Sequence, residues 1–215
     1  MKLTPEPPKD CQLCHRLVTY REDVRAKEPG WFNGAVPSFG DPEASLLVLG
    51  LAPGVTGAHR TGRPFTGDYA GDLLYATLTK FGFANGKFAA HPEDGLELHD
   101  AIVSNAVRCV PPQNKPIGAE INACRPFLLD RIKALPNLRA IVCLGRIAHD
   151  TLIRGLGHRL AAYPFAHQAA HDLGPLRVFD SYHCSRYNTN TGRLTTPMFE
   201  AVFADVRCFL DGAAP

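Results

Sequence analysis

The chain has 215 residues, 45% of them hydrophobic, which is enough to bury one sizeable core, so we expect a single α/β domain. Its formal net charge of +2 excludes a protein that holds nucleic acid through bulk positive charge. The N-terminus lacks the apolar core of a signal peptide and no apolar run approaches membrane-spanning length, so we expect a cytoplasmic protein with reduced cysteines.

The first half of the chain predicts one strand and one helix between less regular segments. Residues 1–10 are rich in proline and indicate a flexible N-terminal arm. Residues 27–44 mix glycine and proline with aromatic residues, which favours a surface loop. The continuous apolar run at 46–52 predicts a strand buried on both faces. An apolar stripe then predicts a helix over 71–83.

The second half predicts strands and helices in alternation. Residues 85–99 are polar and indicate an excursion from the core, and the histidine-bearing segment 158–172 (His158, His167, His171) favours a polar loop near the ligand over a zinc site. We expect three more strands, at 102–107, 140–145 and 176–182, and three more helices, at 119–135, 146–154 and 198–210.

This alternation predicts a three-layer α/β/α domain over residues 11–215, with a central four-stranded parallel sheet and helices on both of its faces. Ligands of such sheets bind beyond the carboxyl ends of the strands. Three loops follow strands there, at 53–68, 108–118 and 183–195. We therefore expect the functional site among these three loops.

The first of these loops is rich in groups that suit a nucleotide. Its glycines let a ligand approach the backbone, Arg60 and Arg63 suit phosphate, Phe65 offers a stacking face and Asp68 offers a charge. Arg108 and Arg125 are further candidates for phosphate contacts.

Four of the seven cysteines indicate a metal or cluster site. Cys11 and Cys14 form a C-x₂-C pair, and Cys109 and Cys124 can complete a set of four ligands. The alternative is four separate thiols, and zinc and an iron–sulfur cluster are not separable by spacing alone. Ordinary packing is expected for the remaining cysteines Cys143 and Cys208, whereas the role of Cys184 stays open.

Three segments carry a resemblance to a known family. GLAPGVTGAHRTGRPFTGD (50–68), SNAVRCVPPQNKP (104–116) and HCSRYNTNTGRLT (183–195) resemble motifs of the uracil-DNA glycosylase superfamily, most closely its family 5 (UDGb-type) enzymes. The resemblance implies a monofunctional glycosylase that flips uracil, or another deaminated base such as hypoxanthine, out of DNA and hydrolyses its glycosidic bond in base excision repair. It also implies a structural [4Fe–4S] cluster on Cys11, Cys14, Cys109 and Cys124.

The resemblance implies roles for residues of the first two loops. Gly50 and Ala52 would back the base pocket, and Phe65 would stack on the flipped base, although it could simply be core. Asp68 would position or activate water, although it could also cap the next helix. Asn105 would read the edge of uracil, although it could satisfy turn backbone groups.

The third loop would hold the departing base and the DNA. His183 would donate a hydrogen bond to a uracil carbonyl, although a lone histidine is more often core. Asn188 would contact base or backbone. The residues expected to bind DNA, by gripping its backbone or filling the gap left by the flipped nucleotide, are Ser185, Arg186, Tyr187 and Arg193.

The chain departs from the family pattern at Thr56, His59 and Cys184, which bears on base specificity. The alternatives are a non-catalytic damaged-DNA-binding protein of the same fold and an unrelated zinc-stabilised nucleotide-binding module. DNA is the expected partner of what we expect to be a monomer, associated with the nucleoid in a prokaryote.

Overall fold

A mixed sheet of six strands forms the centre of the computed structural model, which describes residues 5–212. Its four inner strands are parallel, as predicted, and lie in the order β5 (Ala101–Asn105), β2 (Leu46–Gly50), β6 (Ala140–Leu144) and β8 (Leu176–Ser181). Short antiparallel strands that the sequence did not predict extend both edges, β1 (Phe39–Gly40) beside β5 and β7 (Ala170–Leu173) beside β8.

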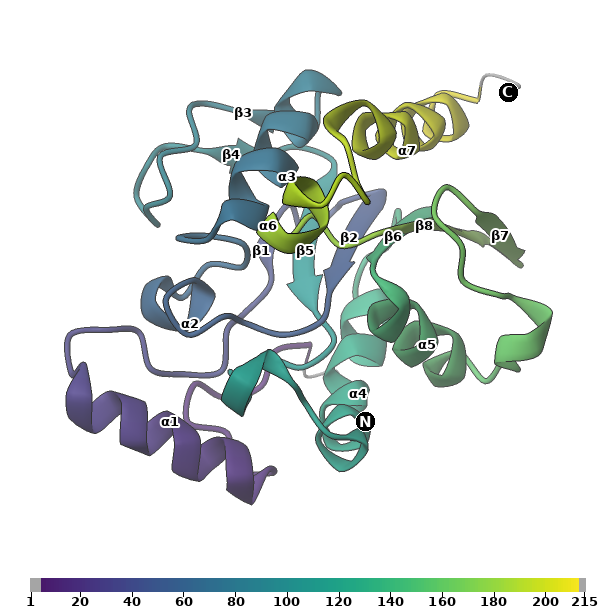
Figure 1. The fold of residues 1–215 in the computed structure, drawn as a ribbon. Helices are drawn as coiled ribbons and strands as arrows, with labels where there is room; N and C mark the ends of the chain where they lie inside the picture. The colour runs from purple at the N-terminus through teal and green to yellow at the C-terminus, as the bar shows by residue number, and fades with distance from the viewer. Residues whose placement is uncertain (1–4, 213–215) are drawn as a thin grey trace.

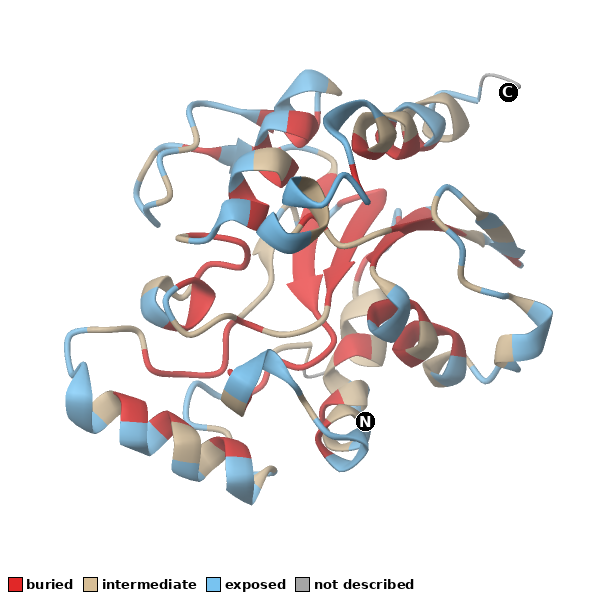
Figure 2. Cartoon of the chain, viewed as in Figure 1, coloured by how far each residue is buried: buried red, intermediate tan, exposed pale blue. Residues whose placement is uncertain are grey.

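Helices cover both faces of this sheet, which confirms the three-layer prediction (Figure 1). One face packs against α3 (Tyr69–Lys80) and α7 (Thr196–Leu210). The other packs against α4 (Gly118–Lys133) and α5 (Arg146–Gly155). Strands β2, β5 and β6 are buried along their whole length because water reaches neither face, as Figure 2 shows in red.

Several short elements lie in the connections between these layers. They are the helices α2 (Ala58–Thr61) and α6 (Arg186–Asn190), the 3₁₀ turns η1 (Pro112–Asn114) and η2 (Leu160–Ala162), and the paired strands β3 (Ala84–Asn85) and β4 (Glu97–Leu98). The last two belong to the polar excursion expected at 85–99.

Helix α1 (His15–Lys27) was not predicted from the sequence. Its buried side chains, Leu17, Arg21 and Val24, include a charged one, so the apolar stripe that marks a surface helix is broken. Leu17 packs beside Cys109 and Cys124 in a third, small core outside the main layers. The helix therefore closes the side of the molecule where the four cysteines meet.

Two predictions for the N-terminal part were wrong. Residues 5–10 are anchored, because Glu6 forms ion pairs with Arg108 (2.8 Å) and Arg131 (2.5 Å); residues 1–4 lie outside the described part. The segment 27–44 is not a surface loop along its whole length, because residues 33–36 are buried. Backbone N–H groups of this buried stretch donate to the carbonyls of His59, Lys9 and Arg108. Both segments gain partners that lie far along the chain, and local composition does not reveal them.

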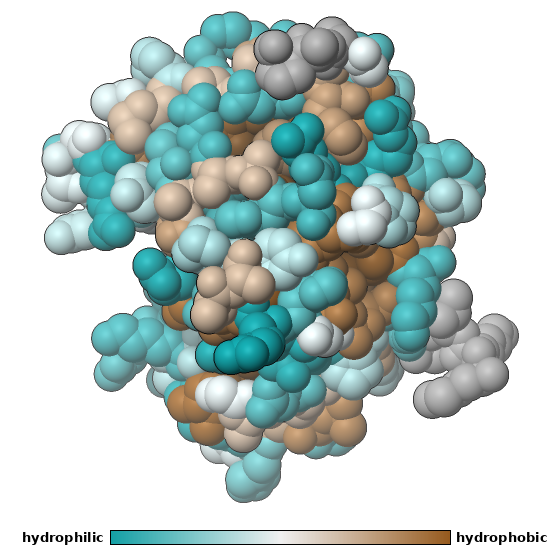
Figure 3. Space-filling model, turned by 90° about the vertical axis from the view of Figure 1, so that its right-hand side faces the viewer, coloured by the Kyte–Doolittle hydropathy of each residue, from teal (hydrophilic) through white to brown (hydrophobic). Residues whose placement is uncertain are grey.

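The outer surface is mixed in character. On the face that carries β7, hydrophilic side chains surround patches of apolar surface (Figure 3). Among residues 5–212, we find no helix with the length and apolar character needed to cross a bilayer.

Candidate active site

A cavity of about 260 Å³ opens at the carboxyl ends of β2, β5 and β8. This is slightly below the range of about 300–1,000 Å³ that holds drug-sized ligands, so it suits a single nucleobase. Its walls come from all three predicted loops: Leu51, Ala52, Pro53, Gly54, Ala58, Phe65, Asp68, Asn105, Asn114 and His183. The structure thus brings together Asp68, Asn105 and His183, which the sequence separates by up to 115 positions.

Phe65 forms one wall of this cavity and also belongs to the main core, since its side chain is buried. Its ring lies 6.0 Å from that of His183, with 26° between the two planes. Behind it stands Gly50, where a β-carbon would lie 2.6 Å from the Phe65 ring and would collide with Oδ1 of Asn105. Gly50 therefore does not line the cavity but lets the aromatic ring and the amide approach each other.

Asp68 combines the two roles that the sequence suggested. It caps helix α3, accepting a hydrogen bond from the backbone N–H of Gly71 at 3.3 Å. Its side chain reaches solvent at the mouth of the cavity, but desolvation by the cavity walls raises its pKa. Hydrogen bonds from the backbone N–H groups of Ala70 and Gly71 partly offset this rise. Asp68 is thus a carboxylate that can take a proton near the reacting position.

His183 lies between the base cavity and a second hollow. Burial lowers the pKa of His183 to about 4, so its ring is neutral at pH 7. Within residues 5–212, nothing bonds its ring nitrogens, which leaves one N–H free for a ligand. The amide of Asn188 donates to the His183 carbonyl at 2.8 Å and does not line the base cavity, so it positions His183 in this structure.

The second hollow, of about 350 Å³, is built from basic and aromatic side chains. The Arg146 guanidinium lies 5.5 Å from the centre of the Phe165 ring, and that of Arg193 lies 4.6 Å from the Tyr182 ring. Neither guanidinium has a hydrogen-bond or ion-pair partner in the described part of the chain. Their N–H groups are therefore held in place and free to bind an anion.

The remaining DNA-binding candidates flank the cavity on its other side. Ser185 caps α6, and Arg186 lies over the Tyr69 ring at 5.6 Å. Ser185 and Arg186 also line a shallow groove that reaches Asp68. Tyr187 is 72% exposed, so its side chain projects into solvent next to Arg186.

The predictions of phosphate contacts at Arg63 and Arg108 were wrong. Arg63 is buried and paired with both carboxylate oxygens of Asp94, at 2.7 and 2.9 Å, and Arg108 is buried against Glu6. Arg60 donates to the Thr56 carbonyl and Arg125 to Asn122, so these two stabilise local backbone and helix structure.

The three residues that depart from the family pattern, Thr56, His59 and Cys184, do not line the base cavity. His59 is completely buried behind the loop and does not line the cavity, and Thr56 lines the groove outside it. Cys184 is also buried, and its thiol points to the Ala70 carbonyl at 3.5 Å. Burial raises the pKa of Cys184, which excludes a reactive thiolate and assigns it to packing under α3.

Cys11, Cys14, Cys109 and Cys124 meet around one small cavity between α1 and α4. All four are free thiols. Four cysteine sulfurs that face one cavity are a ligand set that both a zinc ion and an iron–sulfur cluster accept.

The charges around these cysteines suit a metal ion or cluster held by thiolates. Burial raises the pKa of Cys109 to about 12 and that of Cys124 to about 11, so the unliganded thiols stay protonated. The buried guanidinium of Arg21 lies 3.8 Å from the Cys109 sulfur, and its Nε and Nη2 have no hydrogen-bond partner. Thiolates bound to a cluster would provide the missing negative charge.

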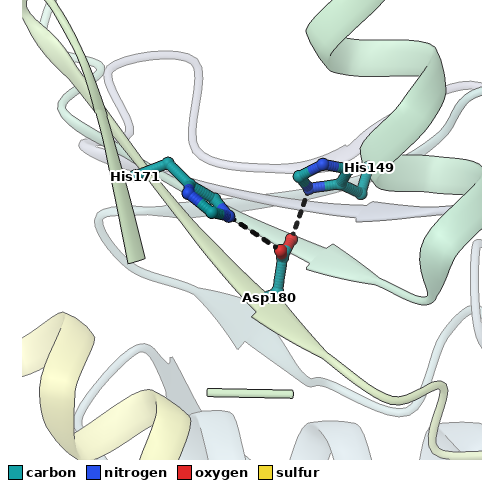
Figure 4. Close-up of side chains that lie close together, drawn as sticks. All are labelled: His149, His171 and Asp180. Atoms are coloured by element: carbon teal, nitrogen blue, oxygen red, sulfur yellow. Dashed lines mark hydrogen bonds and ion pairs between the residues drawn. The ribbon is translucent and has the colours of Figure 1, made fainter. Parts of the chain in front are cut away.

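A separate polar group lies between α5 and the β7 edge of the sheet. Asp180 accepts hydrogen bonds from Nδ1 of His149 at 2.8 Å and from Nε2 of His171 at 3.2 Å (Figure 4). Nε2 of His149 lies 2.8 Å from the Tyr163 carbonyl. Since both nitrogens of His149 face acceptors, its surroundings favour the protonated ring. The prediction of a polar loop near the ligand is wrong for His171, which lies in β7.

This group predicts that stability depends on pH. Burial lowers the pKa of His149, but the bond to Asp180 and its charge outweigh burial and raise it. The resulting stability is fully present below the ordinary pKa of about 6.5 and is lost as pH rises through the raised pKa, with a slope of at most about 1.4 kcal/mol per pH unit. Urea unfolding from pH 6 to 9 should show this loss, and His149→Gln should flatten the profile at lower overall stability.

Comparison with known proteins agrees with this geometry. The sequence profile of the uracil DNA glycosylase superfamily matches residues 37–207, and the chain belongs to this superfamily. It is 45% identical to the type-5 uracil-DNA glycosylase of Thermus thermophilus over 92% of both chains. It is 36% identical to the type-5 uracil-DNA glycosylase of Pyrobaculum aerophilum, over 93% of this chain and 90% of the relative. It is also 34% identical to the type-4 uracil-DNA glycosylase of that organism, over 70% of this chain and 63% of the relative. Within the superfamily, the chain is a member of the type-5 uracil-DNA glycosylases.

Asn114 and Arg146 are polar residues of the site that were not singled out from the sequence. Asn114 lines the base cavity, although the segment NKP that contains it was part of the resemblance. Arg146 begins α5, separated by one residue from the end of β6, and belongs to the second hollow. Its position after a strand was a signal of the same kind as those of the three predicted loops.

Proposed function

We infer that this protein removes uracil from DNA by hydrolysing the N-glycosidic bond, the first step of base excision repair. The observation that carries this function is the base-sized cavity in which an aromatic wall, an amide, a neutral histidine and a carboxylate converge. The type-5 name of the relatives supports uracil as the substrate.

The cavity walls suggest how the bond is broken. The flipped base stacks on Phe65, and the Asn105 amide offers a donor and an acceptor to its edge. His183 donates its N–H to a carbonyl oxygen of the base as negative charge develops there. Because the ring is neutral, it donates this hydrogen bond without transferring its proton to the base.

Asp68 acts on the sugar side of the same bond. Its carboxylate stabilises positive charge at C1′ and accepts a proton from the attacking water. The water oxygen bonds to C1′ while the bond from C1′ to the base breaks, and the base leaves with that electron pair and is protonated through Asp68 and solvent. The products are the free base and an abasic site.

The second hollow and the rim suggest the path of the DNA. Arg146 and Arg193 would hold backbone phosphate next to the flipped nucleotide, Ser185 and Arg186 would hold the other side, and Tyr187 would fill the gap in the duplex.

This path predicts a salt-dependent effect of Arg193→Met. Binding to a duplex that carries an abasic-site analogue should weaken, and the slope of log K against log salt should fall by about 0.9, the loss of one phosphate contact. Fluorescence anisotropy at several salt concentrations measures both. Arg154→Met, which removes an exposed arginine from α5, serves as control, and an unchanged slope for Arg193→Met would refute the assignment.

The four cysteines would hold a [4Fe–4S] cluster. When bound, it would supply a rigid cross-link between the N-terminal segment, the loop after β5 and helix α4, with no part in the hydrolysis. Absorbance together with iron and acid-labile sulfide analysis of the purified protein tests this, and stoichiometric zinc without iron would disprove it.

The function is tested by measuring base release from single- and double-stranded DNA that contains uracil or hypoxanthine. We expect uracil release, with hypoxanthine as a further substrate, by a protein acting as a monomer on nucleoid DNA. Tight binding of the damaged DNA without release would instead identify a non-catalytic damage-binding protein.

A further inference from the structure

Arg21 of helix α1 is a buried cation without a well-placed anion. The side chain is fully buried, and Nη1 donates to the Cys11 carbonyl at 3.1 Å and lies 3.8 Å from the Cys109 sulfur. Among the described residues the one carboxylate within ion-pair distance of Arg21 is that of Glu22, 3.6 Å from Nε. Asp10, which pairs with Arg25, feels the Arg21 charge from farther away. Glu22 is 47% exposed and lies closer to Arg25, at 3.0 Å.

Other buried arginines of this protein are paired differently. Arg63 makes two hydrogen bonds to the buried carboxylate of Asp94, and Arg108 bonds Glu6 at 2.8 Å. An uncompensated buried charge is strongly destabilising. The groups that take the place of a carboxylate beside Arg21 are the sulfur of Cys109 and the carbonyl of Cys11, and both residues belong to the four-cysteine set.

We propose that Arg21 is the charge-compensating residue of the cysteine site. It raises the reduction potential of the bound iron–sulfur cluster and slows the loss of the cluster from the protein. The proposal rests on the cofactor proposed above. A cluster held by four thiolates is an anion, and reduction makes it more negative. A fixed cation in a site that excludes water stabilises the more negative state most, so Arg21 raises the potential.

The test compares variants of the purified holoprotein. Arg21→Met keeps most of the side-chain volume and removes the charge, so the midpoint potential should fall and the cluster should be lost to a chelator at least threefold faster. Arg21→Lys keeps the charge, so its potential should stay near that of wild type. Lys27→Met, an exposed change on the same helix with the same loss of charge, should alter neither quantity.

A second variant gives the opposite sign at a site that should not disturb folding. Glu22→Gln removes the carboxylate that competes for Arg21, so the potential should rise. An equal potential in Arg21→Met and wild type, or an unchanged one in Glu22→Gln, would overturn the proposal. If Arg21→Met cannot be isolated with its cluster while Arg21→Lys can, the dependence on charge supports it. Absence of iron and sulfide from the wild type would refute the cofactor itself, which separates the two failures.

Discussion

Replacing Asp68 by asparagine is expected to lower the single-turnover rate of uracil release by about 10²–10⁴-fold, the usual loss for a general base. Asparagine is the informative choice because it caps a helix as well as aspartate does. Alanine would remove the cap of α3 together with the carboxylate and would confound stability with chemistry. Rapid-quench measurement of base release, with DNA affinity as the control, isolates the chemical effect.

The pH dependence of the same reaction identifies the group. Desolvation raises the pKa of Asp68. The rate of uracil release should therefore fall as the pH drops through that raised pKa, because the carboxylate becomes protonated. His183 takes up a proton only near pH 4, because burial lowers its pKa to about that value. The acidic limb should be absent from the residual activity of Asp68→Asn. A variant within tenfold of wild type, or one that retains the limb, would remove Asp68 from the chemistry.

The second large effect is expected from Gly50→Ala, a change of one methyl group. The new β-carbon would collide with the Asn105 oxygen and lie 2.6 Å from the Phe65 ring, so one of the two must leave its place in the cavity. Misplacement by about 1 Å can cost about 10²-fold in rate, and we expect a loss of kcat/KM of that order.

The matched control is Gly30→Ala, because a β-carbon there meets nothing within 4 Å. It should leave kcat/KM unchanged. Circular dichroism and thermal unfolding separate a local effect of Gly50→Ala from loss of the fold. Full activity of a correctly folded Gly50→Ala protein would show that the wall can move freely and would contradict the rigid cavity described above.

The parallel core could be predicted because its signals are local. Each inner strand is a continuous apolar run, and the helices between them carry regular apolar stripes. Helix α1 escaped prediction because Arg21 occupies one of its buried positions. The edge strands β1 and β7 have two and four residues, too few for a pattern, and they exist through pairing with β5 and β8.

The site was predictable where residues follow strands and much less so where pairing is distant. Asp68, Asn105 and His183 come from loops that any parallel sheet of this type brings together. Arg63 resembled a phosphate ligand, but its partner is Asp94, 31 residues away along the chain. The same holds for Arg108 and Glu6, which are 102 residues apart. Sequence composition states which charges are present but not which ones neutralise each other.

The backbone of Phe65 has a consequence for the evolution and engineering of this enzyme. This residue has a φ of 54°, in the left-handed region that side chains avoid, and such a conformation costs on the order of 1–3 kcal/mol. The carbonyl of Phe65 also lies so close to Gly71 that any side chain there would collide with it. Glycine at position 65 would relieve this strain but would empty the space of a nearly buried ring, at a cost of about 3–5 kcal/mol, so packing keeps the strained residue in place. A thermostabilised variant of this protein should be screened for base release at every round, because a residue with a strained backbone is also the proposed contact to the base.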